Sequence, residues 1–387
     1  MKNILYIVST LTNNGPTNQL YNVIKYLDRN TYKPFIITLS RETANSVWDE
    51  FKKLGVCLNA LNLSRIKGLF LAKKKIERFI DEIKPGIIHS QGIRGDIISS
   101  KIKKMLPKIT TVHCILQLDY IMTYGMLIGM MMYIQHSKVL KNMSLCIGVS
   151  GAVSDNLRQK LNISDSITIY NGVNMDSFYT NTILNKNDTK NYYLISAEDK
   201  IILRKKLNLP ANAKILITSG VLTSRKDPLF LINSWIKTQN ITDVGHLVFI
   251  GDGILKEKCK NLALASDNIH IIGQVNNVAD YLFAADYYVS SSQAEGFPLA
   301  VLEAMTCGLP VLLSDIEPHK EILNLAPKAG FLYKLKSEND FTESLNRIIQ
   351  ADKKKMSMAA LEVIKSTLNA KIMSENYQEI YRSLINE

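Results

Sequence analysis

Short apolar runs alternate with longer amphipathic segments along most of the chain, and the alternation forms two separate series. The runs have the length of buried strands, and a strand followed by a helical pattern is typical of βαβ units in a parallel sheet with helices on both faces. The expected strands are residues 4–8, 34–39, 86–89, 109–113 and 167–170 in the first series, and 214–219, 247–250, 269–272, 287–290, 310–313 and 330–333 in the second. Helices are expected from Pro16 and over residues 44–54. The sequence therefore predicts an α/β fold with two doubly wound parallel sheets.

The length of 387 residues fits two domains, because a typical domain has ~150 residues. Residues 174–200 are polar and lack a clear period, so a linker is expected there. We predict a first Rossmann-like domain over residues 1–175, a linker or surface excursion over 176–200, and a second Rossmann-like domain over 201–369. A C-terminal helix over about 370–387 is expected to pack back on the first domain. The two domains are expected to face one another across a cleft.

The net charge of +12 lies in the first half, because residues 1–171 contain 23 Lys and Arg against 11 Asp and Glu. Such a field attracts phosphates of nucleic acid, of anionic lipid or of a phosphorylated acceptor, although general solubility is an equal alternative. No nucleic-acid-binding module and no basic stripe with interleaved aromatic residues is present, which argues against nucleic acid.

Residues 120–137 carry no charge, and their Met-rich core over residues 121–134 is 14 residues long. A helix that crosses a bilayer needs ~20 apolar residues, so a buried helix or one that lies at a membrane interface is expected. This segment and the basic first half together favour peripheral contact with an anionic membrane.

Five scattered cysteines without a CxxC spacing support neither a disulfide framework nor a zinc site, and they fit a reducing cytosol. The opening residues 1–11 lack a small-residue cleavage site and lead into a loop and a helix, so we interpret them as a first buried strand. The expected location is cytoplasmic, at or near the inner face of the cell membrane.

Gly15 lies in a loop that follows the first expected strand, directly before a helix with Pro16 in its first turn. In a parallel sheet, ligands bind beyond the carboxyl ends of the strands, and a helix N-terminus there offers N–H groups to phosphate. Gly15 would let the backbone approach such a ligand. A simple strand-to-helix turn is the alternative, because the dinucleotide pattern GxGxxG is absent.

His113 closes another expected strand at the same kind of edge. An imidazole there is suited to bind sugar hydroxyls or a phosphate, and a structural histidine with satisfied hydrogen bonds is the alternative. Asp119 and Tyr120 follow closely and are candidates for shaping an acceptor pocket.

Arg225 and Lys226 follow the first strand of the second series, just before a helix that starts near Pro228. Arginine provides a planar fork of donors and lysine a point charge, and the two together are suited to a diphosphate. Solvated surface charge is the alternative.

The most informative segment is residues 290–310, in which an expected strand leads into a glycine turn and a helix of about ten residues. Pro298 is predicted as the first helical residue and Gly308 as the end of the helix. Glu295 would lie on the turn, and the amides of Phe297 and Leu299 would point at a bound diphosphate. Glu303 would lie on an otherwise apolar helix, where its carboxylate needs a partner such as ribose hydroxyls or a basic side chain.

The sequence EGFPLAVLE, followed by EAMTCGLPVLLSD, resembles the donor-site motif of family 4 retaining glycosyltransferases, which have the GT-B fold. The resemblance covers nearly all of the chain in the family's order. It includes the Gly15 loop and residues 111–113, 148–150, 170–174, 220–226, 251–253 and 273–282.

The resemblance implies a role for each matching position. Arg225 and Lys226 resemble the basic pair that binds the donor diphosphate, and Glu303 resembles the carboxylate that binds the ribose. Glu295 resembles the residue at the donor-sugar hydroxyls near the anomeric carbon. His113 resembles the N-domain histidine close to the transferred sugar.

Gly15 resembles the loop glycine that approaches the distal phosphate, and base recognition is implied for the backbone around Val275. The family often has arginine directly after the glycine of the loop that follows this strand, whereas Val221 occupies that place here. The implied catalytic residues are His113, Glu295, Arg225 and Lys226. The implied donor-binding residues are Gly15, Arg225, Lys226, Gly251, Val275, Glu295, Gly296, Phe297, Leu299 and Glu303. No metal site and no cofactor are implied.

The expected function is transfer of a sugar, with retention, from a nucleotide diphosphate sugar to a saccharide or lipid-linked acceptor in bacterial surface polysaccharide or glycolipid synthesis. A UDP-sugar is the favoured donor. A nucleotide-sugar epimerase of the same architecture and a non-catalytic nucleotide-sugar-binding scaffold are the alternatives.

Overall fold

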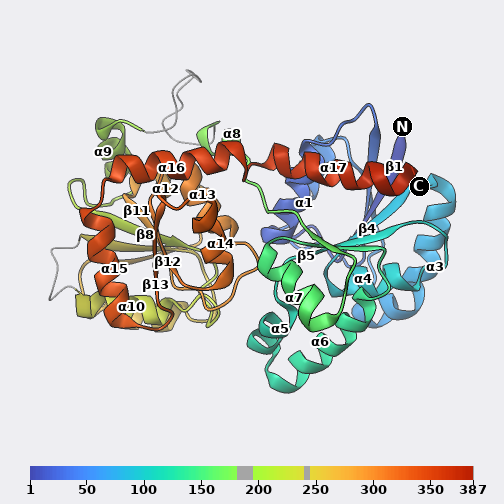
Figure 1. Ribbon diagram of the computed structural model, residues 1–387, viewed down its shortest axis with the longest axis horizontal. Coiled ribbons are helices and arrows are strands. Elements are labelled where there is room, and N and C mark those ends of the chain that lie inside the picture. The colour runs from blue at the N-terminus through green and yellow to red at the C-terminus, as the bar shows by residue number, and fades with distance from the viewer. Residues whose placement is uncertain (181–194, 239–244, 387) are drawn as a thin grey trace. The chain divides into compact units, whose positions relative to one another are not determined.

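A computed structural model describes residues 1–180, 195–238 and 245–386 of the protein (Figure 1). The chain forms two compact units, of which the first comprises Met1–Gly172 together with Ala370–Glu387 and the second comprises Val173–Asn369. Each unit is a parallel sheet covered by helices.

The N-terminal unit contains a seven-stranded sheet in the order β3-β2-β1-β4-β5-β6-β7. Its strands are β1 (Lys2–Val8), β2 (Tyr32–Thr38), β3 (Cys57–Ala60), β4 (Ile87–Gln91), β5 (Lys108–Val112), β6 (Leu145–Gly148) and β7 (Ser166–Thr168), and all pair in parallel. Successive residues of β1 are fully buried because helices cover both faces of the sheet. The strand order reverses between β1 and β4, and ligands of doubly wound sheets bind at such a point.

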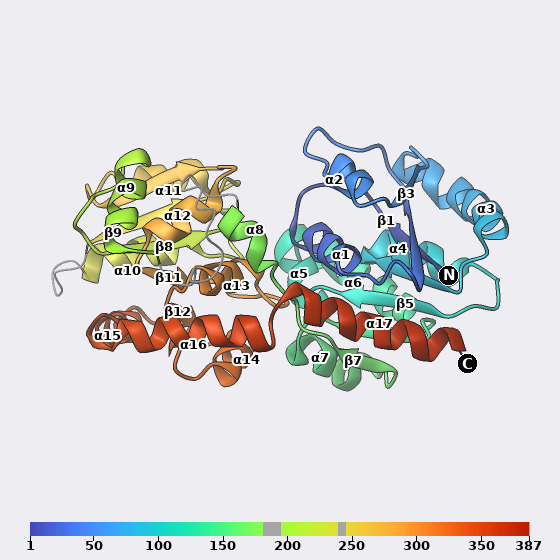
Figure 2. The same cartoon turned by 90° about the horizontal axis from the view of Figure 1, so that it is seen from above.

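The helices of this unit are α1 (Gly15–Lys25), α2 (Trp48–Lys53), α3 (Arg65–Ile83), α4 (Gly92–Lys101), α5 (Leu116–Tyr124), α6 (Met126–Leu140), α7 (Gly151–Leu161) and the C-terminal α17 (Ala370–Asn386). Figure 2 shows α17 beside α1, and the two helices are in contact. Buried tyrosines attach α17 to the sheet: the Tyr377 hydroxyl lies 2.9 Å from Thr111 Oγ1, and the Tyr381 hydroxyl lies 2.8 Å from His89 Nδ1. The last helix of the sequence is therefore part of the N-terminal unit.

The C-terminal unit contains a six-stranded parallel sheet in the order β10-β9-β8-β11-β12-β13. Its strands are β8 (Ile215–Ser219), β9 (His246–Ile250), β10 (Ile269–Gly273), β11 (Tyr287–Ser290), β12 (Val311–Ser314) and β13 (Gly330–Tyr333). Its helices are α8 (Met175–Thr180), α9 (Ala197–Lys206), α10 (Pro228–Thr238), α11 (Lys256–Ala263), α12 (Val278–Ala284), α13 (Leu299–Thr306), α14 (Glu317–Leu325), α15 (Glu338–Gln350) and α16 (Lys353–Ser366). Here the strand order reverses between β8 and β11, so the loops that follow these two strands lie next to each other.

Two strands are absent from the sequence prediction. β3 is only half-buried at the edge of its sheet, so it has no continuous apolar run, and β6 was not predicted although it is as long as β11. The predicted helix over residues 44–54 is shorter than expected, because Ser46 forms an isolated bridge with Thr12 and its hydroxyl accepts a hydrogen bond from Trp48 N (3.2 Å). The helix α2 therefore begins only at Trp48.

The Met-rich segment differs from the single helix that its composition predicts. Gly125 has φ of +79° and separates α5 from α6, so the segment is a helical hairpin. Within the described residues, no helix combines the length and the apolar character that crossing a membrane requires. The predicted linker over 176–200 is helical at both ends, in α8 and in the start of α9, and residues 181–194 of it lie outside the described residues.

Candidate functional site

The loop that follows β8 and the loop that follows β11 are joined by hydrogen bonds at the reversal point of the C-terminal sheet. Gln293 N donates to Arg225 O (2.8 Å), and Gln293 Nε2 donates to Asp227 Oδ2 (2.6 Å). The Ser291 hydroxyl contacts Lys226 O and Asp227 O, both at 2.9 Å. These contacts give the basic pair of the first loop a defined position relative to the second loop.

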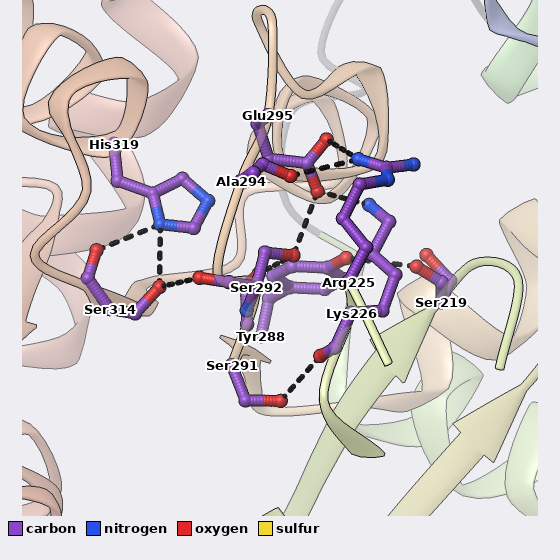
Figure 3. Close-up of polar contacts among 11 residues, drawn as sticks. Ser219, Arg225, Lys226, Tyr288, Ser291, Ser292, Ala294, Glu295, Ser314 and His319 are labelled. Atoms are coloured by element: carbon purple, nitrogen blue, oxygen red, sulfur yellow. Dashed lines mark hydrogen bonds and ion pairs between the residues drawn. The ribbon is translucent and has the colours of Figure 1, made fainter. Parts of the chain in front are cut away.

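The Glu295 carboxylate faces both cations, with one oxygen toward each (Figure 3). Arg225 Nη1 donates to Glu295 Oε2 (2.9 Å) and to Ala294 O (2.8 Å), and Lys226 Nζ lies 2.5 Å from Glu295 Oε1. The Ser292 hydroxyl donates to the same Oε1 at 2.7 Å. The sequence-predicted residues Arg225, Lys226 and Glu295 therefore form one cluster.

The Glu295 carboxylate is ionised over the whole physiological pH range. Burial raises its pKa, but Lys226, Arg225 and the hydrogen bonds outweigh burial and lower the pKa to about 2. The cluster is thus a fixed anion that holds two partly exposed cations. An anionic ligand that bound these oriented cations would compete with the carboxylate for them.

Glu303 is half-buried on α13, eight residues after Glu295. None of the ion pairs among the described residues includes Glu303, so the alternative of an ion pair with a basic side chain is not observed in that part of the chain. Burial raises the pKa of Glu303 to about 7, and nearby Lys226 opposes this shift. A carboxyl group in this state is suited to bind paired hydroxyls.

Helix α13 is shorter than predicted. Pro298 is its N-cap, with φ of −75° and ψ of 105°, and the first helical residue is Leu299. The helix ends at Thr306, and Gly308 follows with φ of +71°, a left-handed conformation that favours glycine. Gly296 and Phe297 are buried in the turn that connects Glu295 to this helix.

A second layer of residues supports the cluster, and the sequence analysis did not identify it. The Ser314 hydroxyl donates to Ser292 O (2.6 Å), and His319 Nδ1 lies 2.8 Å from Ser314 O (Figure 3). The Tyr288 hydroxyl donates to Ser219 O at 3.3 Å, and both residues line a small cavity of about 20 Å³ beside Lys226. The three consecutive serines at the end of β11, residues 290–292, could have indicated these supporting hydrogen bonds.

Two other predicted donor-binding residues, Gly251 and Val275, lie in the loops that follow β9 and β10. A Cβ on Gly251 would lie 1.9 Å from Gly220 O, so packing of backbone between β8 and β9 explains this glycine. Val275 is half-buried in the loop between β10 and α12.

A cavity of about 300 Å³ lies in the N-terminal unit, at the reversal point of its sheet. His113 follows β5 and lines this cavity, and its Nε2 atom is buried without a hydrogen-bond partner in the part of the chain that the structure describes. Burial lowers the pKa of His113 to about 4, and Asp96 opposes this shift, so the ring is neutral at pH 7. An unpaired nitrogen on a cavity wall is suited to contact a polar ligand.

Asp119 and Tyr120 also line the cavity, as the sequence analysis expected, together with His136, which it did not identify. Gly15 is exposed and is the first residue of α1 rather than a loop residue, because the Asn14 side chain caps the helix by accepting from Thr17 N (3.0 Å). Asn14, Pro16 and Thr17 line the cavity beside it. No group of three or more potential metal-binding side chains occurs among residues 1–180, 195–238 and 245–386.

Family models match both halves of the chain. The model described as glycosyltransferase family 4 matches residues 13–177, and the model described as glycosyl transferases group 1 matches residues 199–360. Together the two models span most of the sequence.

Similar proteins agree with this result. The O-antigen biosynthesis glycosyltransferase WclY of Escherichia coli is 24% identical over 99% of both chains. A UDP-Gal:alpha-D-GlcNAc-diphosphoundecaprenol alpha-1,3-galactosyltransferase of Escherichia coli is 29% identical over 46% of this chain and 44% of that protein. The crystal structure of Anabaena HepE in complex with UDP superimposes with a TM-score of 0.76 at 18% identity, over 99% of this chain and 100% of the other, which shows a shared fold.

Proposed function

This chain belongs to the glycosyltransferases, with a family 4 domain in its first half and a group 1 domain in its second, and it has the GT-B fold. We propose that it transfers a hexose, with retention, from a UDP-sugar to a saccharide or lipid-linked acceptor. One observation carries the proposal: Arg225 and Lys226 are both paired with Glu295 where the strand order of the C-terminal sheet reverses. A nucleotide diphosphate is the ligand class that suits two oriented cations at such a place.

In this proposal the C-terminal unit binds the donor. Arg225 and Lys226 stabilise the negative charge that grows on the diphosphate as the bond to the anomeric carbon breaks, and the loop contacts hold the backbone of both residues in place. Glu303 binds the ribose hydroxyls, and Glu295 contacts hydroxyls of the donor sugar. The remaining proposed donor contacts are Gly15, Gly251, Val275, Gly296, Phe297 and Leu299.

The N-terminal unit binds the acceptor in its cavity of about 300 Å³. The cavity wall combines polar groups with apolar side chains such as Leu11 and Leu116, a mixture that suits a saccharide ring. The unpaired Nε2 of His113 is proposed to contact the transferred sugar. The relatives that carry O-antigen and diphosphoundecaprenol in their names support a role in surface polysaccharide or glycolipid synthesis.

The surface of the hairpin formed by α5 and α6 supports the proposal that the acceptor is bound at a membrane. Figure 1 shows the hairpin at the lower edge of the N-terminal unit. Large apolar side chains are exposed along it, namely Leu118, Tyr124, Met126, Leu127, Ile128, Met131 and Ile134. The surfaces of soluble proteins rarely expose so many large apolar side chains in one patch, and such a patch marks an interaction site. Because Leu116 and Tyr120 of the same helix α5 line the acceptor cavity, a lipid attached to a bound saccharide would lie near this patch.

Charge indicates which partner covers the hairpin. The N-terminal unit contains 25 Lys and Arg against 14 Asp and Glu, a net charge of +11, and the C-terminal unit contains 22 against 21. Two copies of the N-terminal unit would repel each other, whereas anionic lipid headgroups would attract it. We therefore infer peripheral contact with an anionic membrane, at its inner face.

A donor screen tests the proposed function. The purified protein is incubated with UDP-, GDP- and ADP-sugars, with and without a divalent metal, and binding, hydrolysis and transfer to diphosphopolyprenyl saccharides are measured. We expect selective binding and slow hydrolysis of one UDP-sugar, and a transferred sugar with the donor's anomeric configuration. Epimerised donor without transfer would favour the epimerase, and binding without any turnover would favour the scaffold.

A further inference from the structure

Three side chains from three helices form a buried chain of hydrogen bonds in the wall of the acceptor cavity. His136 Nε2 of α6 lies 2.7 Å from Asp96 Oδ2 of α4, and His136 Nδ1 lies 2.7 Å from the Tyr120 hydroxyl of α5. All three side chains are at least nine-tenths buried, and Tyr120 and His136 both line the cavity. The Tyr120 and His136 rings stack with centroids 6.0 Å apart.

The surroundings of Asp96 assign the protons. Its Oδ1 accepts hydrogen bonds from the Ser90 hydroxyl (2.6 Å) and from the Thr110 hydroxyl (2.7 Å), so this oxygen is an acceptor. With Asp96 as a carboxylate, Nε2 of His136 carries a proton and donates to Oδ2. In the neutral imidazole Nδ1 then has a lone pair, and the Tyr120 hydroxyl donates to it. The lone pairs of the Tyr120 oxygen remain available to accept a hydrogen bond.

We propose that Asp96, His136 and Tyr120 form a proton relay that receives the proton of the acceptor hydroxyl during glycosyl transfer. The inference rests on the proposed function, because it assigns the attacking hydroxyl to the cavity that Tyr120 lines. In the relay Tyr120 contacts the substrate, and His136 and Asp96 act through it.

The acceptor oxygen forms its bond to the anomeric carbon on the face from which the diphosphate departs, so the configuration is retained, and the diphosphate leaves with the bonding electron pair. The acceptor O–H proton moves to the Tyr120 oxygen while the Tyr120 proton moves to His136 Nδ1. The Asp96 carboxylate stabilises the resulting imidazolium, which loses its proton to solvent after the product leaves.

Tyr120 is suited to pass a proton on in a concerted transfer, and it is not suited to act as a tyrosinate base. Burial raises the pKa of Tyr120 far above its usual value, and Cys114 and Asp96 add to the shift. The side chain therefore stays a hydroxyl at neutral pH and passes one proton on only as it receives another.

Tyr120→Phe removes the hydroxyl and keeps the ring that stacks on His136. We expect kcat for transfer to fall about 10²- to 10³-fold, as is typical when general base catalysis is lost, with KM for the acceptor changed much less. Tyr133→Phe is the matched control, since Tyr133 lies on the neighbouring helix α6 and is not among the residues that line the cavity. The control should transfer at the wild-type rate.

Asp96→Asn tests the direction of the relay. The asparagine oxygen can keep both hydroxyl donors, so its NH₂ group faces His136 Nε2 and donates to it. Nε2 then accepts, Nδ1 carries the proton, and the hydrogen bond to Tyr120 is reversed. We expect a kcat loss as large as that of Tyr120→Phe, and a double variant no slower than the slower single variant, because both changes interrupt one relay.

UDP binding, for which most of the proposed contacts lie in the C-terminal unit, reports on integrity and should be retained in every variant. Rates in mixtures of H₂O and D₂O give the distinguishing readout: the wild type should show the curved dependence of a step that moves two protons, and Tyr120→Phe should not. A Tyr120→Phe variant that keeps wild-type kcat, or that changes only KM, would overturn the relay and leave the proposed function intact. Absence of transfer by the wild type with every acceptor would overturn the proposed function itself.

Discussion

Lys226 Nζ lies 2.5 Å from Glu295 Oε1, across the reversal point between β8 and β11. The two residues are 69 positions apart in the sequence, and the second cation, Arg225, binds the other oxygen of the same carboxylate. The candidate donor site is therefore assembled before any ligand arrives, with its positive charge partly neutralised from within.

Glu295→Gln should separate binding from turnover. The amide no longer neutralises Arg225 and Lys226, so a diphosphate meets less competition for them, and we expect UDP affinity to rise about tenfold, in line with a charged hydrogen bond of ~1.5 kcal/mol. Transfer should fall because the proposed contact with the donor sugar is lost. Calorimetric titration with UDP measures the first effect, and a decrease in UDP affinity would contradict the competition.

Lys226→Met should weaken UDP binding by about 10- to 100-fold, because a partly buried charged contact to the diphosphate is worth ~1.5–3 kcal/mol. The lysine that pairs with Glu338, Lys237, provides the control, since it is largely exposed. Lys237→Met should bind UDP as the wild type does. Equal losses in the two variants would indicate a general effect of net charge rather than a diphosphate contact.

Binding of a UDP-sugar should depend on pH through Glu303. Its pKa of about 7 in the free protein means that the group is half protonated at neutral pH, whereas two ribose hydroxyls bind best to a carboxylate. Affinity should therefore be constant above pH 8 and fall by up to tenfold per unit as pH decreases below 7. An intact UDP-sugar is the right probe because its diphosphate does not titrate in this range.

Glu303→Gln supplies the comparison for this titration. The variant should bind more weakly at pH 8 and should lose the pH dependence. A wild-type affinity that is flat between pH 6 and pH 8 would exclude Glu303 as the group that binds the ribose.

Leu127→Asp should weaken association with vesicles that contain anionic lipid. The Leu127 side chain is 82% exposed in the apolar hairpin, so the substitution has little effect on the core, but it places a charge where lipid is proposed to bind. Leu264→Asp, at 85% exposure in the C-terminal unit, is the matched control. Cosedimentation should separate the two variants, and equal binding of both, or binding that is indifferent to anionic lipid, would refute the membrane contact.

Much of the fold follows from local pattern. Strands that are buried on both faces require continuous apolar runs, and these runs predicted two parallel sheets in the correct order along the chain. The edge strand β3 was not predicted because it is half-buried, and β6 was not predicted although it is as long as β11. The break at Gly125 was not predicted, because a single glycine within an apolar helical pattern does not reveal its backbone conformation.

For the candidate site, the sequence by itself determined what is local: the turn that holds Glu295, the helix that follows it and the place of Glu303 on that helix. Tertiary structure alone decided which distant groups meet, including Glu295 with Arg225 and Lys226, and Asp96 with His136 and Tyr120. The physical reason is that a pattern of apolar and polar residues records the period of one element. Contacts between elements depend on strand order and helix packing, which are set by burial over the whole unit.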